Sequence, residues 1–235
     1  MPPAATRRIR WALRSVVSFP LAASTRDRIL RAALHLFNER GEAHVSLAQI
    51  ANRLGISEGN LWYHFRTKRD LVAALFAELE ERIDRNLSRD PALAGGHLAD
   101  FGDYARQSFR DIWEYRFLYR RRCDPEEENE LAQRTVALTD RAHRYTERIL
   151  AEMVRQNLMA ANAQEITELA ANAWIISRYW LDYLQERHGV ARITEADLHA
   201  GVKQLFALYR PYLTDIARAQ EAAHEAPPKR RAVRG

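Results

Sequence analysis

Apolar residues recur at steps of three and four along most of this chain, and no stretch alternates with a period of two for long. Ile29, Ala33 and Leu36 show this spacing early in the chain, and Leu71 and Leu75 begin a longer run. A period near 3.6 places apolar side chains on one face of an α-helix, whereas a strand needs alternation. We therefore predict an all-α protein of about nine helices.

Capping residues and breaks divide this pattern into segments. Ser24, Thr25, Ser46, Ser57 and Thr67 are of types that cap helix N-termini, and glycine and proline end helices. The predicted helices run from Ser24 or Thr25 to Gly41, from Ser46 to Gly55, from Glu58 to about His64, from Thr67 through Leu87, and then over 97–122, 126–138, 139–159, 163–188 and 194–217. A loop is expected over Asp90–Gly96, which contains Pro91, Gly95 and Gly96.

The length of 235 residues allows one or two domains with a substantial core. Charged residues interrupt every apolar run before it reaches membrane-spanning length, so we expect a soluble protein with no membrane partner. The single cysteine, Cys123, cannot form an internal disulfide, which favours a reducing, cytoplasmic setting. A secretory signal is not expected, because Arg14 and Pro20 interrupt the apolar part of the N-terminus.

Charge is distributed unevenly along the chain. Residues 1–70 carry a net charge of +7, residues 71–226 carry −6, and the last nine residues add +4. This pattern favours a polyanion-binding head on a body with another task, although chance clustering is the alternative. We therefore divide the chain into a flexible basic arm (1–23), a basic helical head (24–70), an acidic helical body (71–221) and a flexible basic tail (222–235).

Residues 46–65, SLAQIANRLGISEGNLWYHF, combine two short helices with a tight turn. Two helices that cross steeply need a small residue where they approach and a residue that tolerates positive φ at the turn, and Ala51 and Gly55 meet these needs. We expect the apolar residues of the motif to form a small core beneath: Ile50, Leu54, Ile56 and Leu61. The polar first turn of the second helix is then free to enter a DNA major groove.

The stretches RILRAALHLFNERG and VSLAQIANRLGISEGNLWYHFRTKRDLV resemble the TetR family of bacterial repressors, over residues 24–75 or so. The Gly-Ile-Ser, Gly-Asn-Leu, His-Phe and Thr-Lys elements stand in the family's order and spacing. The resemblance implies a helix-turn-helix DNA-binding domain (24–70) followed by a helical effector-binding and dimerisation domain (71–221). It also implies a double-stranded DNA operator, a homodimer and a small-molecule effector.

The resemblance further implies roles for individual residues. Base reading maps to the first turn of the third helix, Ser57 to Asn60, and phosphate contacts map to Trp62, Tyr63, His64 and Lys68, whose side chains can all donate hydrogen bonds. The family usually has Tyr where this chain has Trp62. The full DNA-binding set is Ser46, Ser57, Glu58, Gly59, Asn60, Trp62, Tyr63, His64, Thr67 and Lys68.

Several of these residues have a second interpretation. Trp62 could pack against the protein instead of a phosphate, and His64 could make a structural hydrogen bond. Leu61 and Phe65 are expected in the core. The arginines of the N-terminal arm fit either a minor-groove contact or a solvated tail.

The body contains a helix that is aromatic on nearly every side, FGDYARQSFRDIWEYRFLYRRR. Such a helix should be enclosed by its neighbours, and its aromatics are candidates either for the core or for the wall of a cavity. The candidate effector-pocket residues are Phe109, Trp113, Phe117, Tyr119 and Trp174. Arg120, Arg121 and Arg122 fit either an acidic ligand or a solvated helix end, and nothing marks Cys123 as a reactive thiol.

Long apolar stripes mark the last two predicted helices. In the resembling family these helices pair with their twofold mates in a four-helix bundle. The candidate dimer-interface residues are Ile176, Trp180, Leu184, Leu198, Val202, Leu205 and Tyr209. A dimer would space two recognition helices to read a palindrome.

We therefore interpret the chain as a homodimeric, ligand-responsive regulator, a repressor that leaves its operator when a small molecule fills the body, with the helix that begins near Thr67 transmitting the change. The alternative is a DNA-binding regulator whose body docks a protein partner. An all-α enzyme is a third possibility, but glycine-rich phosphate loops, Gly-x-Ser-x-Gly, His-Glu-x-x-His and Cys-x-x-Cys are missing from the sequence. We expect no enzymatic activity, no cofactor and no metal site.

Overall fold

The computed structural model describes residues 24–88, 98–120, 130–190 and 192–219, with the backbone alone for 98–100. The predicted arm (1–23), the Asp90–Gly96 loop, Arg121, Arg122, Cys123 and the tail from 222 lie outside these residues. The described part confirms the all-α prediction, since its strand-like pairing is limited to one bridge between Met159 and Leu213. Its labelled helices are α1 (Thr25–Arg40), η1 (Glu42–His44), α2 (Leu47–Leu54), α3 (Glu58–His64), α4 (Lys68–Leu87), α5 (Leu98–Glu114), α6 (Arg116–Arg120), α7 (Glu130–Arg155), α8 (Ala163–His188), α9 (Glu195–Tyr209) and η2 (Arg210–Tyr212). Residues 215–219 are also helical.

Caps predicted from the sequence define several helix ends. Ser24 and Thr67 accept hydrogen bonds from backbone N–H groups of the first turns of α1 and α4, and each takes part in a reciprocal capping box. Gly41, at a φ of 80°, ends α1. The predicted helix over 163–188 is confirmed residue for residue as α8, between Asn162 and the left-handed Gly189.

Other predicted helix boundaries were wrong. The helix predicted over 97–122 breaks at Tyr115, where Leu118 N–H bonds to the Tyr115 carbonyl and the Asn38 side chain takes the carbonyl of Glu114. The helices predicted over 126–138 and 139–159 are one helix, α7, because no glycine or proline interrupts it. The helix predicted over 194–217 ends at Tyr209, since Pro211 has no N–H to continue it.

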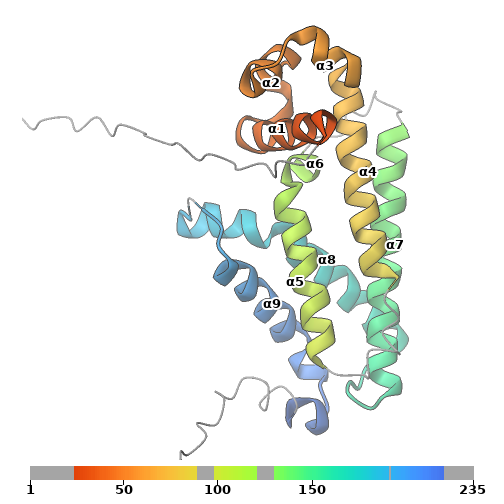
Figure 1. Cartoon of the computed structure of the whole chain (residues 1–235). Helices are drawn as coiled ribbons and strands as arrows, with labels where there is room; N and C mark the ends of the chain where they lie inside the picture. Colours follow the sequence, from red (N-terminus) through yellow and green to blue (C-terminus); the bar gives the residue numbers. More distant parts are fainter. Residues whose placement is uncertain (1–23, 89–97, 121–129, 191, 220–235) are drawn as a thin grey trace, which may run out of the picture.

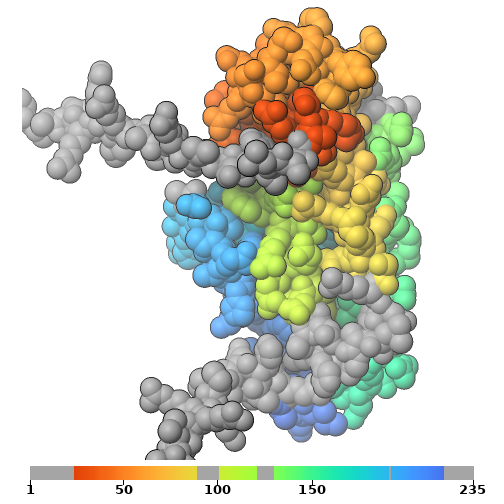
Figure 2. Space-filling view, viewed as in Figure 1, coloured from red at the N-terminus to blue at the C-terminus, as the bar shows by residue number. Residues whose placement is uncertain are grey.

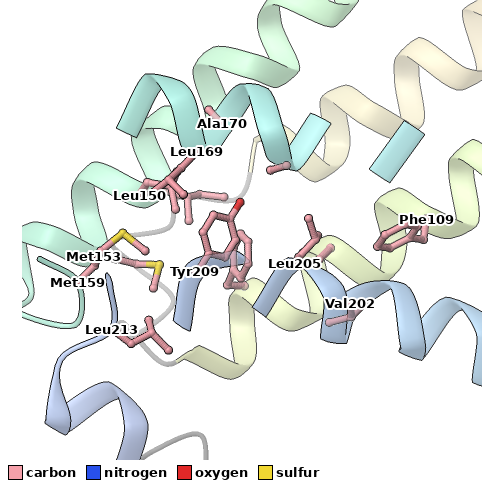
Figure 3. Packing of buried hydrophobic residues seen from close by; sticks show 14 of the residues in the cluster. Phe109, Leu150, Met153, Met159, Leu169, Ala170, Val202, Leu205, Tyr209 and Leu213 are labelled. Carbon is pink, nitrogen blue, oxygen red and sulfur yellow. The ribbon is translucent and has the colours of Figure 1, made fainter. Parts of the chain in front are cut away.

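Two hydrophobic cores organise the molecule. One lies under α1 to α4 and also takes in Tyr115 and Phe117 from the α5–α6 junction, and the other lies among α5, α7, α8 and α9. In Figure 1, α1, α2 and α3 form one end of the molecule, and α4 runs from this end down along α7. Figure 3 shows the second core, where Tyr209 and Leu205 of α9 face the helices that carry Phe109 and Leu150.

Within the described residues, no helix is both long enough and apolar enough to cross a membrane.

Candidate nucleic-acid interface and effector cavity

The turn between α2 and α3 is set by caps on both sides. Ser46 and Gln49 form a capping box at the start of α2, with bonds of 3.2 Å and 2.9 Å. Gly55 ends α2 in the left-handed region at a φ of 67°, where a side chain would be strained. Ser57 then caps α3 by accepting a 3.2 Å bond from the N–H of Asn60.

Apolar residues fix the crossing of the two helices from below. Ile50, Ala51 and Leu61 are buried, as predicted, while Leu54 and Ile56 are half-buried at the edge of the same core. Phe65 is buried just after α3, so Leu61 and Phe65 both point inward as expected.

The opposite face of α3 is polar and open to solvent. Glu58, Gly59 and Asn60 are exposed, and the Asn60 side chain is not used by the cap, which involves only its backbone N–H. Figure 2 shows α2 and α3 at the outer end of the molecule, where the rest of the chain in this view leaves them uncovered. An exposed polar helix face of this kind can enter a DNA major groove.

Two large aromatic side chains stand beside this face without being packed into the protein. Trp62 is 52% exposed and Tyr63 is 86% exposed, which argues against the packing alternative for Trp62. His64 is half-buried with its ring 5.1 Å from that of Tyr63. The indole N–H and the phenol O–H are therefore available as donors to phosphate oxygens.

Lys68 and Thr67 serve the structure as well as the proposed interface. The Lys68 ammonium donates a 2.9 Å bond to the carbonyl of Glu42, which ties the start of α4 to η1. Thr67 caps α4 through a 3.1 Å bond from the N–H of Asp70. An ammonium has three N–H donors, so Lys68 retains capacity for a phosphate.

A hydrogen-bonded junction joins this head to the body. The Asn38 amide of α1 donates to the Glu114 carbonyl at 2.6 Å and accepts from the Phe117 N–H at 3.1 Å. Without Asn38, the break between α5 and α6 would leave these two backbone groups unpaired. The Phe117 ring packs 5.1 Å from that of Phe37. Tyr115 donates to Glu78 at 3.1 Å, and Arg31 pairs with the same carboxylate.

The body contains a cavity of about 220 Å³ between α4, α6, α7 and α8, which we call the outer cavity. Aromatic and aliphatic side chains dominate its wall, among them Phe76, Leu79, Tyr119 and Trp174. Arg178 contributes the charged group of the wall and donates to the Tyr119 carbonyl.

A smaller space of about 70 Å³, the inner cavity, reaches α5 and α9. Its wall shares Ile83, Tyr119, Ala142 and Trp174 with the outer cavity, so the two are neighbours. Polar groups enter it from several helices: Asn86, Tyr104, Ser108, Asp111, His143, Thr146, Ser177 and Tyr209.

The five predicted effector residues do not lie together. Tyr119 and Trp174 line both cavities, whereas Phe109, Trp113 and Phe117 line neither. Phe109 is buried in the core of the body, and Phe117 belongs to the core of the head. Trp113 lies under the Arg116 guanidinium at 4.1 Å, so these three side chains serve packing.

Most predicted dimer residues are also packed inside one copy. Leu184, Leu198, Val202, Leu205 and Tyr209 are buried in the core of the body within a single copy. Ile176 and Trp180 are half-buried, and the Trp180 indole donates to the Asp197 carbonyl at 3.0 Å. The apolar stripes therefore mark the faces by which α8 and α9 pack against the core of the same protomer.

The exposed apolar residues of α8 lie on another face. Ile175, Tyr179 and Tyr183 are about half exposed and follow one another at steps of four residues. Sequence reasoning missed this stripe because it is narrower than the buried one. It also missed Asp111, whose burial among aromatic residues raises the pKa of its carboxyl.

Comparison with known proteins agrees with this arrangement. A family model described as "Bacterial regulatory proteins, tetR family" matches residues 29–75, and one described as "Bacterial transcriptional repressor" matches residues 76–220. The chain belongs to the TetR family. It is a transcriptional regulator of DNA-binding helix-turn-helix type, not an enzyme.

Individual members of the TetR family resemble the chain to different degrees. The transcriptional regulator SrpR of Pseudomonas putida is 24% identical over 75% of this chain and 83% of its own length. A crystal structure of a TetR-family regulator from Marinobacter aquaeolei VT8 is 30% identical, with a TM-score of 0.74 over 86% of this chain and 98% of that one. A complex of SmeT with triclosan shares the fold, with a TM-score of 0.58 at 20% identity over 82% of this chain and 93% of SmeT.

Proposed function

We propose that this TetR-family protein is a homodimeric repressor that binds a palindromic operator through α3 and releases it when a small molecule enters the body. Residues 24–70 would form the DNA-binding domain and residues 71–221 the effector and dimerisation domain. The observation that carries the proposal is the uncovered polar first turn of α3, Ser57 to Asn60, flanked by exposed Trp62 and Tyr63.

We propose that the apolar stripe of α8, Ile175, Tyr179 and Tyr183, is covered by the same stripe of a second copy. Half-exposed aromatics at helical spacing are uncommon on a solvated surface and suit a self-complementary interface. Tyr179→Glu, which would bury two like charges across a twofold axis, should shift the sedimentation profile from dimer to monomer. A profile that stays dimeric would refute this assignment.

The outer and inner cavities support the effector part of the proposal. They lie between the helices that carry the junction with the head, and Tyr119 lines both cavities two residues after Phe117, which is packed in the head core. A ligand that moves α6 would therefore act on α1 through a chain of direct contacts. SmeT, which shares the fold and is described as the repressor of a multidrug efflux pump, has been solved with triclosan, a small molecule.

A thermal-shift screen followed by operator release tests this function. An effector should raise the melting temperature, because a ligand that binds the folded state stabilises it by mass action. Because ligand and DNA binding are linked, the same compound should weaken operator binding. Compounds that stabilise the protein without releasing DNA, or a screen that yields none, would contradict the small-molecule mechanism.

A further inference from the structure

The inner cavity contains a buried polar group that the described residues do not satisfy. The Tyr209 hydroxyl has no hydrogen-bond partner although the residue is only 1% exposed. Figure 3 shows this hydroxyl pointing from α9 toward the part of α8 that carries Leu169 and Ala170, and Ala170 lines the cavity. A buried hydroxyl without a partner costs free energy, so this group is ready to accept a hydrogen bond from an occupant.

Asp111 brings a carboxylate to the same space. It is 2% exposed, and its recorded contacts, from Gln107 at 3.0 Å and from Arg82 at 3.6 Å, both reach Oδ1. Neither of these two contacts reaches Oδ2. Burial raises the pKa of this carboxyl despite the contacts from Gln107 and Arg82, and a nearby cation would favour its charged form.

The ion-pair network around Asp111 carries an excess negative charge. Arg82 pairs with Glu114 at 2.6 Å, while Arg31 reaches Glu114 at 3.6 Å and pairs with Glu78. Two arginines thus face three carboxylates, and Asp111 is the carboxylate that lines the cavity. A cation placed there would balance the network.

Three tyrosine side chains contribute to the wall of the inner cavity. Tyr104, Tyr119 and Tyr209 all line the inner cavity, and burial raises the pKa of each hydroxyl, so all three stay neutral. Phenol oxygens accept hydrogen bonds from an ammonium group, and phenol rings attract cations. An anion would instead meet the Asp111 carboxylate, and His143, the basic side chain among the described residues of this wall, already lies 3.7 Å from Glu147.

The opposite end suits a ring. The outer cavity presents Phe76, Tyr119 and Trp174 to an occupant. Its Arg178 is held by Asp182 at 3.7 Å and lies 5.1 Å from the rings of Tyr119 and Tyr179.

We propose that the effector is an elongated aromatic molecule with a protonated amine at one end. Its ring occupies the outer cavity, and its ammonium group enters the inner cavity between Asp111 Oδ2 and the Tyr209 hydroxyl. This inference rests on the proposed effector function and adds the chemical class of ligand.

A matched series of three compounds tests the inference: phenylbutylamine, phenylbutanol and phenylbutanoate. Each carries a phenyl ring at one end of a short alkyl chain, and they differ in the polar group at the other end. Binding affinities are measured by calorimetry on the full chain, with tryptophan fluorescence, which includes that of Trp174, as a second readout. The amine should bind most tightly, by about tenfold or more over the alcohol. Asp111→Asn, which keeps the side-chain shape, should reduce this preference to less than about threefold.

Two further variants sharpen the test. Asp103→Asn changes an exposed acid two turns earlier on α5 and should leave the ranking unchanged. Tyr209→Phe should weaken the amine by about three- to tenfold, because it removes the hydroxyl that accepts from the ammonium group.

Other outcomes would overturn the inference. If phenylbutanoate bound most tightly, its carboxylate would lie beside Arg178, and the cavity would select an acid instead of an amine. An amine preference that survives Asp111→Asn, or no binding by the whole series because water fills the inner cavity, would also refute it. Operator binding measured on the same preparation separates the two proposals, since a chain that binds DNA but shows no amine preference keeps the proposed function and loses only this ligand class.

Discussion

Asn38→Ala is the change that most directly tests how the head is joined to the body. The Asn38 amide holds the α5–α6 break by donating to Glu114 and accepting from Phe117. Alanine removes both bonds and leaves a carbonyl and an N–H in a partly buried place with no replacement. The helix itself should tolerate the change, because alanine is the best helix former.

The size of the effect follows from those two groups. An unsatisfied polar group costs about 1 to 3 kcal/mol depending on burial, and this site is only partly buried, so we expect a loss of about 2 to 3 kcal/mol in the free energy of unfolding. For a chain of this size, that corresponds to a drop of roughly 4 to 12 °C in melting temperature. Asn52→Ala, at an exposed position on α2, is the matched control and should change stability by less than about 0.5 kcal/mol.

The free energies of unfolding of the two variants and the parent are compared by chemical denaturation. The junction account also predicts that Asn38→Ala binds effector normally but releases operator less completely, because α6 no longer holds α1. If Asn38→Ala were as stable as Asn52→Ala, or if the effector released operator from it as fully as from the parent, the reasoning about this junction would be wrong.

Three further predictions concern packing, pH and DNA. Gly201→Ala should destabilise by about 1 to 3 kcal/mol in thermal unfolding, because a Cβ there would lie 2.7 Å from the Phe109 ring; unchanged stability would contradict this. Burial raises the pKa of Asp111, so its contribution to stability is present at low pH and is lost as pH rises through the folded-state pKa. The stability of Asp111→Asn relative to the parent should therefore increase as the pH rises above about 4 in urea titrations, and a flat difference would refute the assignment. Lys68→Ala should weaken binding to all duplexes alike and reduce the slope of log K against log salt by about one, and a change confined to one sequence would refute a phosphate contact.

The head was predictable because local signals decide it. Ser46, Gly55 and Ser57 set the turn between α2 and α3 through short-range hydrogen bonds and backbone preference, and the spacing of Ile50 and Leu61 identifies the inward face. Such features depend on a few neighbouring residues, so they can be recognised in a sequence.

The body was less predictable because packing between distant helices decides it. An aromatic stripe cannot show whether Phe117 enters the head core or a cavity wall, since the answer depends on Asn38 and Phe37 in α1. The buried stripes of α8 and α9 pack within one copy, and periodicity alone does not tell such a face from a dimer interface. The inner cavity draws Asn86, Asp111 and Tyr209 from three separate helices, a combination with no local signature.

Selection of binding sites from random duplex DNA tests the central claim that α3 reads base sequence. The parent chain should enrich a twofold-symmetric site whose half-sites lie about one helical turn, or a multiple of it, apart. Asn60→Ala should lose preference at a symmetric pair of positions while Lys68→Ala keeps the same motif at lower affinity. A parent chain that enriches no motif, or an Asn60→Ala chain that enriches the parent motif unchanged, would contradict the account.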